Sequence, residues 1–288
     1  MTNVLLMDGG MGQELIKRSQ RPPTPLWSAQ FLLDDPGLVT QVHQDYIAAG
    51  AQLIKLNNYT LTPQRLTRDA SFSLFEPLHQ QALSCAQQAR GNHPVQIAGC
   101  LPPLVASYHA DVVPDFETCL ASYRQMVAQQ QQGVDVFVAE TMSLLREAKA
   151  ATLAGVESQL PTWVSFTVDD ENGTRLRSGE LLREAAQAVI ALGAQAVLVN
   201  CSVPEQVTVA LRALAGLSVP IGGYANGFTS AAALQPGGTV DHLQARTDLG
   251  PAAYADHAMQ WVDLGAQMIG GCCEVGPSHI AELNKRLL

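Results

Sequence analysis

One pattern recurs four times along the chain and constrains its fold more than any other feature. In each copy a helix-like stretch ends at a glycine, an apolar run follows, and a polar residue comes seven positions after the glycine. The copies run from Gly50 to Asn57, Gly133 to Glu140, Gly193 to Asn200 and Gly265 to Cys272. Helices commonly end at a glycine that adopts the left-handed backbone conformation. A continuous apolar run is typical of a strand that is buried on both faces. The repeat therefore predicts a helix, a turn and a buried strand, with the polar residue at the strand's carboxyl end.

Four further apolar runs raise the number of expected strands to eight; they cover residues 4–7, 95–98, 163–168 and 219–224. Helix-like stretches are expected at residues 36–49, 63–90, 115–132, 143–156, 179–192, 204–216, 250–264 and 277–287. Eight alternations of strand and helix in 288 residues predict an α/β protein, a single-domain (β/α)8 TIM barrel over residues 1–288. A doubly wound open sheet is the alternative. It lacks a glycine fingerprint of the required spacing, and residues 8–12 come nearest to one.

Two long loops are expected over the active face of such a barrel. Residues 18–35 would follow the first strand, and residues 225–249 would follow the seventh and form part of a lid or a donor pocket. Trp27 and Tyr59 fall in loops above this face. Each aromatic side chain either walls a pocket or belongs to the core, and both interpretations stay open.

Charge and apolar patterning exclude several classes of partner. The net charge is -9 with no basic run, which argues against binding to nucleic acid or to an anionic membrane surface. The longest uncharged stretch, residues 185–204, divides into helix, turn and strand, so we expect no membrane span. The first apolar run has no basic residues before it and ends at Asp8, unlike a signal peptide. Six cysteines without disulfide-scaffold spacing favour a reducing, cytoplasmic location.

Three cysteines fall at predicted strand ends: Cys201 after the sixth strand, and Cys272 and Cys273 after the eighth. Strand carboxyl ends line the active face of a barrel, and three thiolates with one open position suit catalytic zinc. Adjacent residues on a strand point to opposite faces, so both neighbours can bind one ion only if the backbone leaves strand geometry, which Gly270 and Gly271 allow. Two alternatives are buried packing as small apolar groups and a vicinal Cys272–Cys273 redox pair.

The other cysteines carry weaker signals. Cys85 and Cys119 lie in helix-like stretches and are expected to pack in the core, whereas Cys100 ends a strand and is a candidate for lining the site without ligating. No histidine pair has metal-ligand spacing.

Polar side chains at other strand ends are candidates for binding substrate. Asp8 ends the first strand and Glu140 the fourth, so the two acids are placed to hold an ammonium group or to act as acid and base. Asp8 is equally consistent with a turn residue, and Glu140 with a favourable contact to the next helix dipole. Asn57 and Asn226 are further candidates for hydrogen bonds to substrate, although asparagine is also common in turns.

Several motifs together resemble the homocysteine S-methyltransferase family. They are Asp-Gly-Gly-Met-Gly at 8–12, Ala-Glu-Thr at 139–141, Asn-Cys-Ser at 200–202 and Gly-Gly-Cys-Cys at 270–273. The resemblance covers nearly the whole chain and implies a (β/α)8 barrel with Zn2+ on Cys201, Cys272 and Cys273. It also implies that Asp8 and the acid of the Glu140-Thr141 motif match the residues that hold the homocysteine amino group, with Thr141 a further candidate for binding substrate.

The same resemblance implies the reaction and its small-molecule partners. It implies methyl transfer to the thiol of L-homocysteine, giving methionine, and it favours a sulfonium donor, S-methylmethionine or S-adenosylmethionine, over betaine. The chain departs from the family pattern at Gln13, at residues 55–59 and at residues 274–276, which leaves the donor open. The oligomeric state is not predicted. A barrel that binds zinc or thiols without catalysis and a vicinal-dithiol redox protein are the alternative functions.

Overall fold

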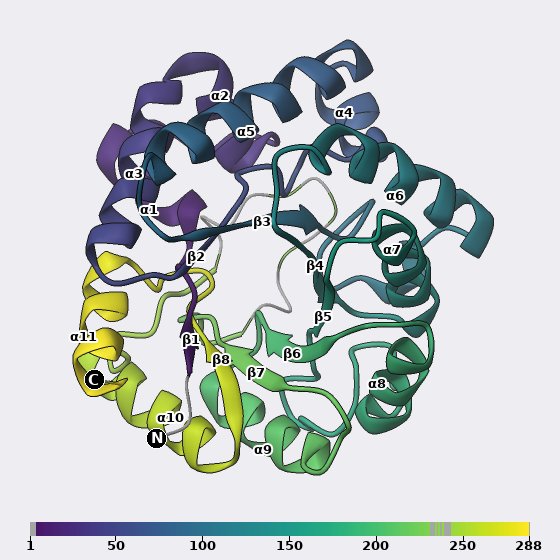
Figure 1. Cartoon of the computed structure of the whole chain (residues 1–288), viewed down its shortest axis with the longest axis vertical. Helices are drawn as coiled ribbons and strands as arrows, with labels where there is room; N and C mark the ends of the chain where they lie inside the picture. Colours follow the sequence, from purple (N-terminus) through teal and green to yellow (C-terminus); the bar gives the residue numbers. More distant parts are fainter. Residues whose placement is uncertain (1–3, 231–233, 235, 237, 239–242, 288) are drawn as a thin grey trace.

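The chain folds as a ring of parallel strands inside a ring of helices (Figure 1). This computed structural model describes all residues except 1–3, 231–233, 235, 237, 239–242 and 288. The strands are β1 (Leu5–Leu6), β2 (Leu53–Lys55), β3 (Gln96–Leu101), β4 (Val136–Met142), β5 (Thr162–Phe166), β6 (Ala196–Asn200), β7 (Ile221–Tyr224) and β8 (Ala266–Ile269). The predicted (β/α)8 barrel is therefore confirmed.

Parallel pairing runs around the ring in the order β1-β8-β7-β6-β5-β4-β3-β2. The two ends of this order meet at a bridge between Met7 and Leu53, where the Asp8 backbone N–H donates to the Leu53 carbonyl at 2.9 Å. On the other side, Leu5 of β1 pairs with Met268 of β8. The first strand thus connects the second strand to the last one.

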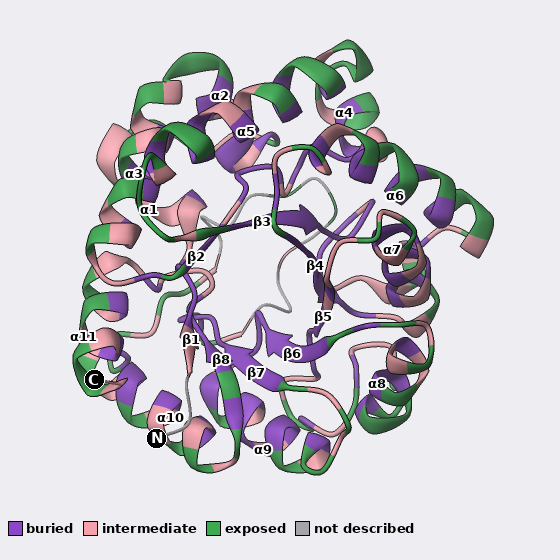
Figure 2. Cartoon of the chain, viewed as in Figure 1, coloured by how far each residue is buried: buried purple, intermediate pink, exposed green. Residues whose placement is uncertain are grey.

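Alternate strand residues divide between two buried clusters. Met7, Leu53, Val138, Leu198 and Tyr224 belong to a small cluster inside the ring, and a larger cluster fills the space between strands and helices. Figure 2 shows most of the strand residues buried and the helices exposed on their outer sides. Residues on the inner face nearest the strand carboxyl ends are therefore available to form a site.

Eleven α-helices lie within the described residues. They are α1 (Met11–Ser19), α2 (Gln30–Asp34), α3 (Pro36–Ala48), α4 (Pro63–Asp69), α5 (Phe75–Arg90), α6 (Phe116–Gln130), α7 (Leu145–Glu157), α8 (Leu182–Ala191), α9 (Pro204–Leu214), α10 (Pro251–Asp263) and α11 (Pro277–Leu287). None of these described helices is both long enough and apolar enough to cross a membrane.

Local chemistry explains several helix starts and one helix break. Asp35 and Asp115 accept hydrogen bonds from the backbone N–H groups of the first turns of α3 and α6. The single helix expected over residues 63–90 is two helices, because Ser71 bonds the backbone N–H of Ser73 and starts a separate 3-10 turn. The loop expected at residues 18–35 is shorter than predicted, since α1 takes its first two residues and the 3-10 turn Trp27–Ala29 and α2 take residues 27–34.

Three of the four glycines in the repeat play the predicted role. Gly50, Gly193 and Gly265 have φ values of 108°, 104° and 92°, as expected for residues that end helices in the left-handed region. Gly133 lacks a positive φ; a side chain there would lie 2.7 Å from Leu83 Cδ2, so close packing explains this glycine.

Candidate active site

Six of the eight predicted site residues line one pocket at the carboxyl ends of the strands. They are Asp8, Asn57, Glu140, Cys201, Cys272 and Cys273. Trp27 and Tyr59 also line this pocket. Thr141 and Asn226 are buried beside it and do not line it.

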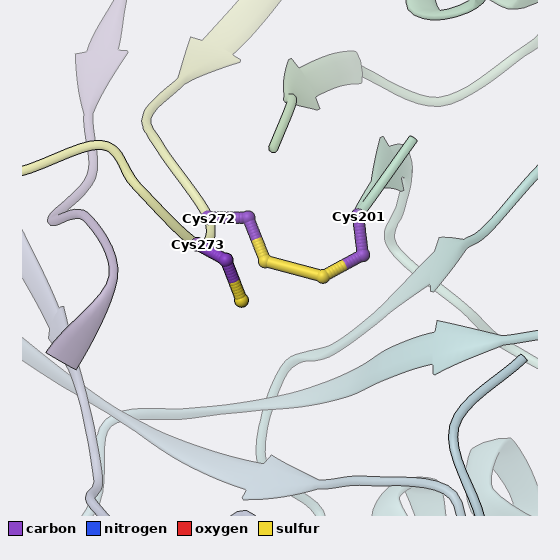
Figure 3. Close-up of side chains that lie close together, drawn as sticks. All are labelled: Cys201, Cys272 and Cys273. Carbon is purple, nitrogen blue, oxygen red and sulfur yellow. A yellow bond between two sulfur atoms is a disulfide. The ribbon is translucent and has the colours of Figure 1, made fainter. Parts of the chain in front are cut away.

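The three predicted metal ligands lie together. Cys201 follows β6 directly, and Cys272 and Cys273 lie in a turn beyond the end of β8. The three sulfur atoms all lie within 4.8 Å of one another. Figure 3 shows Cys201 and Cys272 joined through their sulfur atoms as a disulfide, with Cys273 beside them. The redox alternative named Cys272–Cys273 as the pair; the structure instead pairs Cys272 with Cys201, because the turn brings Cys272 against the end of β6.

Burial controls the charge of the remaining thiol. Desolvation, together with the charges of the nearby acids Glu274 and Glu140, raises the pKa of Cys273 to about 12. The Lys55 ammonium lowers the pKa of Cys273 only slightly in comparison, so Cys273 is a neutral thiol at neutral pH.

Gly270 and Gly271 are required by close packing. Neither has a positive φ, in contrast to the conformational freedom that the sequence interpretation assigned to them. A side chain at Gly270 would lie 2.7 Å from Met7 Cβ, and one at Gly271 would overlap Val275. The two glycines thus let the cysteine turn lie directly against the residues that follow β1, where Gly271 N donates to Asp8 O at 2.9 Å.

Backbone strain is concentrated around the pocket. Thr141, Cys201 and Glu274 have φ values of 60°, 47° and 64°, in the left-handed region that non-glycine residues rarely adopt. Each such residue costs about 1–2 kcal/mol. The register of β4 and β5 also shifts between Ala139 and Met142, so Thr141 lies at an irregularity of the kind that often re-aims side chains near sites.

Asn200 holds the strained backbone of Thr141. Its side-chain oxygen accepts hydrogen bonds from Thr141 N at 3.0 Å and Ser165 Oγ at 2.7 Å, and its nitrogen donates to Thr141 Oγ1 at 2.9 Å. Asn200 therefore connects the end of β6, next to Cys201, to the end of β4, next to Glu140.

The two predicted acids meet a lysine at the bottom of the pocket. Lys55 Nζ lies 2.5 Å from Asp8 Oδ1 and 4.0 Å from Glu140 Oε1. Burial lowers the pKa of Lys55, but the charges of Asp8 and Glu140 raise it more, so its pKa lies above the ordinary value and the side chain is an ammonium. Cys100 donates from Sγ to Glu140 Oε2 at 3.2 Å and does not itself line the pocket.

Asn57 and Asn226 differ in whether their side chains have hydrogen-bonding groups left for a ligand. Asn57 donates to the Ser28 carbonyl at 3.0 Å, and its buried side-chain oxygen has no hydrogen-bond partner among the described residues. Asn226 accepts from Phe228 N at 3.1 Å and holds the turn that follows β7. Asn57 thus offers the pocket an acceptor, whereas Asn226 shapes the loop after β7.

The sequence analysis missed one wall of the pocket, formed by Arg65, Ser107 and Tyr108. Ser107 and Tyr108 line the pocket from the segment after β3, and Arg65 lines it from α4. Ser107 Oγ lies 2.9 Å from Tyr59 Oη and accepts a hydrogen bond from Arg65 at 3.3 Å. The only sequence signal for this wall was Tyr59.

Beneath this wall lies a buried acid. Glu147 of α7 accepts a hydrogen bond from Leu104 N at 2.9 Å, and burial raises its pKa to about 7. Its other carboxyl oxygen has no hydrogen-bond partner among the described residues.

The segment after β7 reaches the pocket, as predicted for residues 225–249. Leu234 and Gly238 line the pocket, and the Leu234 carbonyl lies 2.7 Å from His109 Nε2. Residues 231–233, 235, 237 and 239–242 of this segment lie outside the described residues.

The rim of the barrel therefore carries a site that combines three clustered thiols, two acids and an aromatic wall. Such a site can bind a soft metal ion and a charged small molecule. The homocysteine S-methyltransferase family model matches residues 5–287, and the chain belongs to this family of enzymes.

Relatives from Escherichia coli support this assignment in sequence and in structure. The chain is 32% identical to the homocysteine S-methyltransferase of strain K12, over 99% of this chain and 95% of the relative. The metallated crystal form of the E. coli homocysteine methyltransferase MmuM superposes with a TM-score of 0.83 at 28% identity, covering 99% of this chain and 96% of the other. The oxidized form gives a TM-score of 0.82 at 29% identity, with the same coverage.

Proposed function

We propose that the enzyme transfers a methyl group from a sulfonium donor, S-methylmethionine or S-adenosylmethionine, to the thiol of L-homocysteine, giving methionine. The observation that carries this proposal is the cluster of Cys201, Cys272 and Cys273 on the same pocket as two acids. The thiols suit a zinc-dependent reaction of a thiol substrate, and the acids suit an amino-acid substrate.

The donor set fits zinc. Three thiolates bound to one tetrahedral zinc ion at about 2.3 Å have sulfur atoms roughly 3.8 Å apart. The three sulfur atoms here lie within 4.8 Å, so a small separation of Cys201 from Cys272 after reduction of their disulfide gives that spacing. When bound, zinc supplies a positive charge that ionises a coordinating thiol. Because the disulfide removes two of the three thiolates, we place the reaction in a reducing compartment such as the cytoplasm.

The side chains of the pocket would bind and orient the substrates. The negative charge of Asp8 and Glu140 favours the α-ammonium of homocysteine, and the cysteine rim fixes where its sulfur lies. Trp27, Tyr59 and Tyr108 offer aromatic surfaces, which attract cations such as a sulfonium. Methyl transfer then needs the homocysteine sulfur in line with the donor's methyl–sulfur bond, and the neutral thioether leaves.

A test of the metal site uses single thiol replacements. Cys272→Ser and Cys273→Ser should each lose bound zinc and methyl transfer together, because each replacement leaves two protein thiolates. Cys85→Ser is the matched control: Cys85 is buried in α5 and donates to the Pro36 carbonyl at 3.4 Å, so its replacement should keep both zinc and activity. Full zinc content and turnover in either site variant would contradict the proposal.

The same measurements distinguish the two alternative functions. A non-catalytic zinc barrel would bind zinc stoichiometrically and methylate homocysteine with none of the donors. A dithiol redox protein would show a reducible Cys201–Cys272 bond and no stoichiometric zinc in the reduced state. A screen of S-methylmethionine, S-adenosylmethionine and betaine on the reduced, zinc-loaded enzyme identifies the donor.

A further inference from the structure

Lys55 is an unusual residue for the inside of a barrel. It is the last residue of β2, two positions after Leu53 of the inner cluster, so its side chain points into the ring. The side chain is 11% exposed and lines the pocket. A buried lysine keeps its charge only if its surroundings stabilise that charge, so its contacts define what else it can bind.

The contacts of the Lys55 ammonium leave donor capacity unused. Within the described part of the chain its single hydrogen bond goes to Asp8 Oδ1, at 2.5 Å. Glu140 Oε1, at 4.0 Å, is beyond hydrogen-bond distance, and the Tyr224 ring lies 4.9 Å away. An ammonium has three N–H donors, so two of them face a buried pocket without a described acceptor.

Asp8 and Glu140 differ in what they still lack. Both oxygens of Asp8 accept from Lys55, Oδ1 from the ammonium and Oδ2 from the backbone N–H at 2.8 Å. Among the residues that the structure describes, Glu140 accepts a hydrogen bond only from the weak Cys100 S–H donor, on Oε2. Asp8 is thus engaged with Lys55, and Glu140 is the acid that still lacks a strong cationic partner.

We propose that Lys55 binds the α-carboxylate of the acceptor amino acid while Glu140 binds its α-ammonium. This inference rests on the proposed function, since it requires a thiol-bearing amino acid in the pocket. The two adjacent, incompletely paired charges match the two charges of an amino-acid zwitterion. Asp8 adds negative charge near the substrate ammonium, as in the proposed function, and its contact with Lys55 also aims the Lys55 ammonium. Lys55 makes the site select amino-acid thiols over simple amine thiols.

The test compares two acceptors that differ only in the carboxylate. We would measure kcat/KM for L-homocysteine and for homocysteamine, the same amine thiol without the carboxylate, in the wild-type enzyme and in Lys55→Met. Because Lys55→Met removes a hydrogen bond between charged groups, we expect kcat/KM for homocysteine to fall roughly 10- to 100-fold. The kcat/KM for homocysteamine should change by less than about threefold in the same variant, because that acceptor never makes this contact. The inference would be overturned if Lys55→Met kept the wild-type ratio of kcat/KM between the two acceptors. It would also be overturned if kcat/KM rose with both acceptors, which would mean that Lys55 competes with the substrate ammonium.

Two further variants separate recognition from folding. Lys55→Met leaves Asp8 unpaired and buried, so the double variant Asp8→Asn/Lys55→Met tests the same loss without an orphaned acid. Lys55→Arg keeps the positive charge and should retain most of the preference. Zinc content and thermal unfolding measured on each variant show whether the fold is intact.

A binding readout keeps this test independent of turnover. L-methionine should raise the melting temperature of the wild-type protein more than methylthiopropylamine, its analogue without the carboxylate, and Lys55→Met should lose this difference. Equal shifts from both ligands in the wild-type protein would refute the role of Lys55. Failure of the wild-type enzyme to methylate homocysteine with any donor would instead contradict the proposed function.

Discussion

Replacement of Asn200 by alanine is predicted to be among the most destabilising single changes next to the thiols. The variant removes three hydrogen bonds, two to Thr141 and one to Ser165, from a side chain that is fully buried. At about 1 kcal/mol net for each bond, we expect a loss of about 3 kcal/mol in the free energy of unfolding. The groups left behind are buried and cannot turn to water, so we expect the loss to be no smaller than this value.

Asn58→Ala is the matched control for this prediction. Asn58 is also fully buried and follows β2, but its side chain makes a single described hydrogen bond, to the Cys100 carbonyl at 3.1 Å. Its loss should cost about 1 kcal/mol, so the two variants should differ by about 2 kcal/mol. Urea unfolding of the reduced, metal-free proteins measures both values, provided that the m-values agree. Equal destabilisation within about 0.5 kcal/mol would refute the idea that Asn200 holds the backbone at Thr141.

Two predictions concern buried carboxyl groups. Burial raises the pKa of Glu147 from 4.5 to about 7, so the folded state holds this proton more tightly and stability falls as the pH rises across that window. Glu147→Gln should remove this pH dependence, so its free energy of unfolding should rise relative to wild type by up to about 3 kcal/mol between about pH 4 and about pH 8. Urea unfolding of both proteins across this range measures the difference, and parallel pH profiles would contradict the prediction. Glu140→Gln should raise the KM for homocysteine roughly 10- to 100-fold while zinc content stays the same, because it removes the charge opposite the substrate ammonium. An unchanged KM would argue against that role, and loss of zinc would indicate a structural one.

Much of the fold follows from local sequence signals. Most strand residues of the barrel are buried on both faces, so the apolar runs are visible without knowledge of their neighbours, as in the fully buried β4. The helices that the sequence analysis missed, α1 and α2, are short and lie beside glycine- and proline-rich stretches that resemble loops. The break at Ser71 depends on one side chain bonding a nearby N–H in place of helix continuation.

The candidate site was predictable where a side chain lies at the carboxyl end of a strand or within a few residues after it. Asp8, Glu140 and the cysteines meet because the carboxyl ends of parallel strands share one rim. Ser107 could not be predicted in this way, since it reaches the pocket through a loop held by Tyr59 and Arg65. The hydrogen bonds of Asn200 also depend on tertiary contacts between strands that are far apart in sequence.

The position of the cysteine turn has a consequence for how the protein matures. Gly10 N donates to Val275 O and Gly271 N donates to Asp8 O, both at 2.9 Å, so the turn is held by residues at the opposite end of the sequence. Contacts of such high sequence separation carry a large loop-closure entropy cost until the intervening chain is ordered, so we expect them to form late. A nascent or partly folded chain therefore carries its cysteines without the geometry that brings them together. The ability to take up metal would appear with ring closure, and metal uptake during refolding would report that final step.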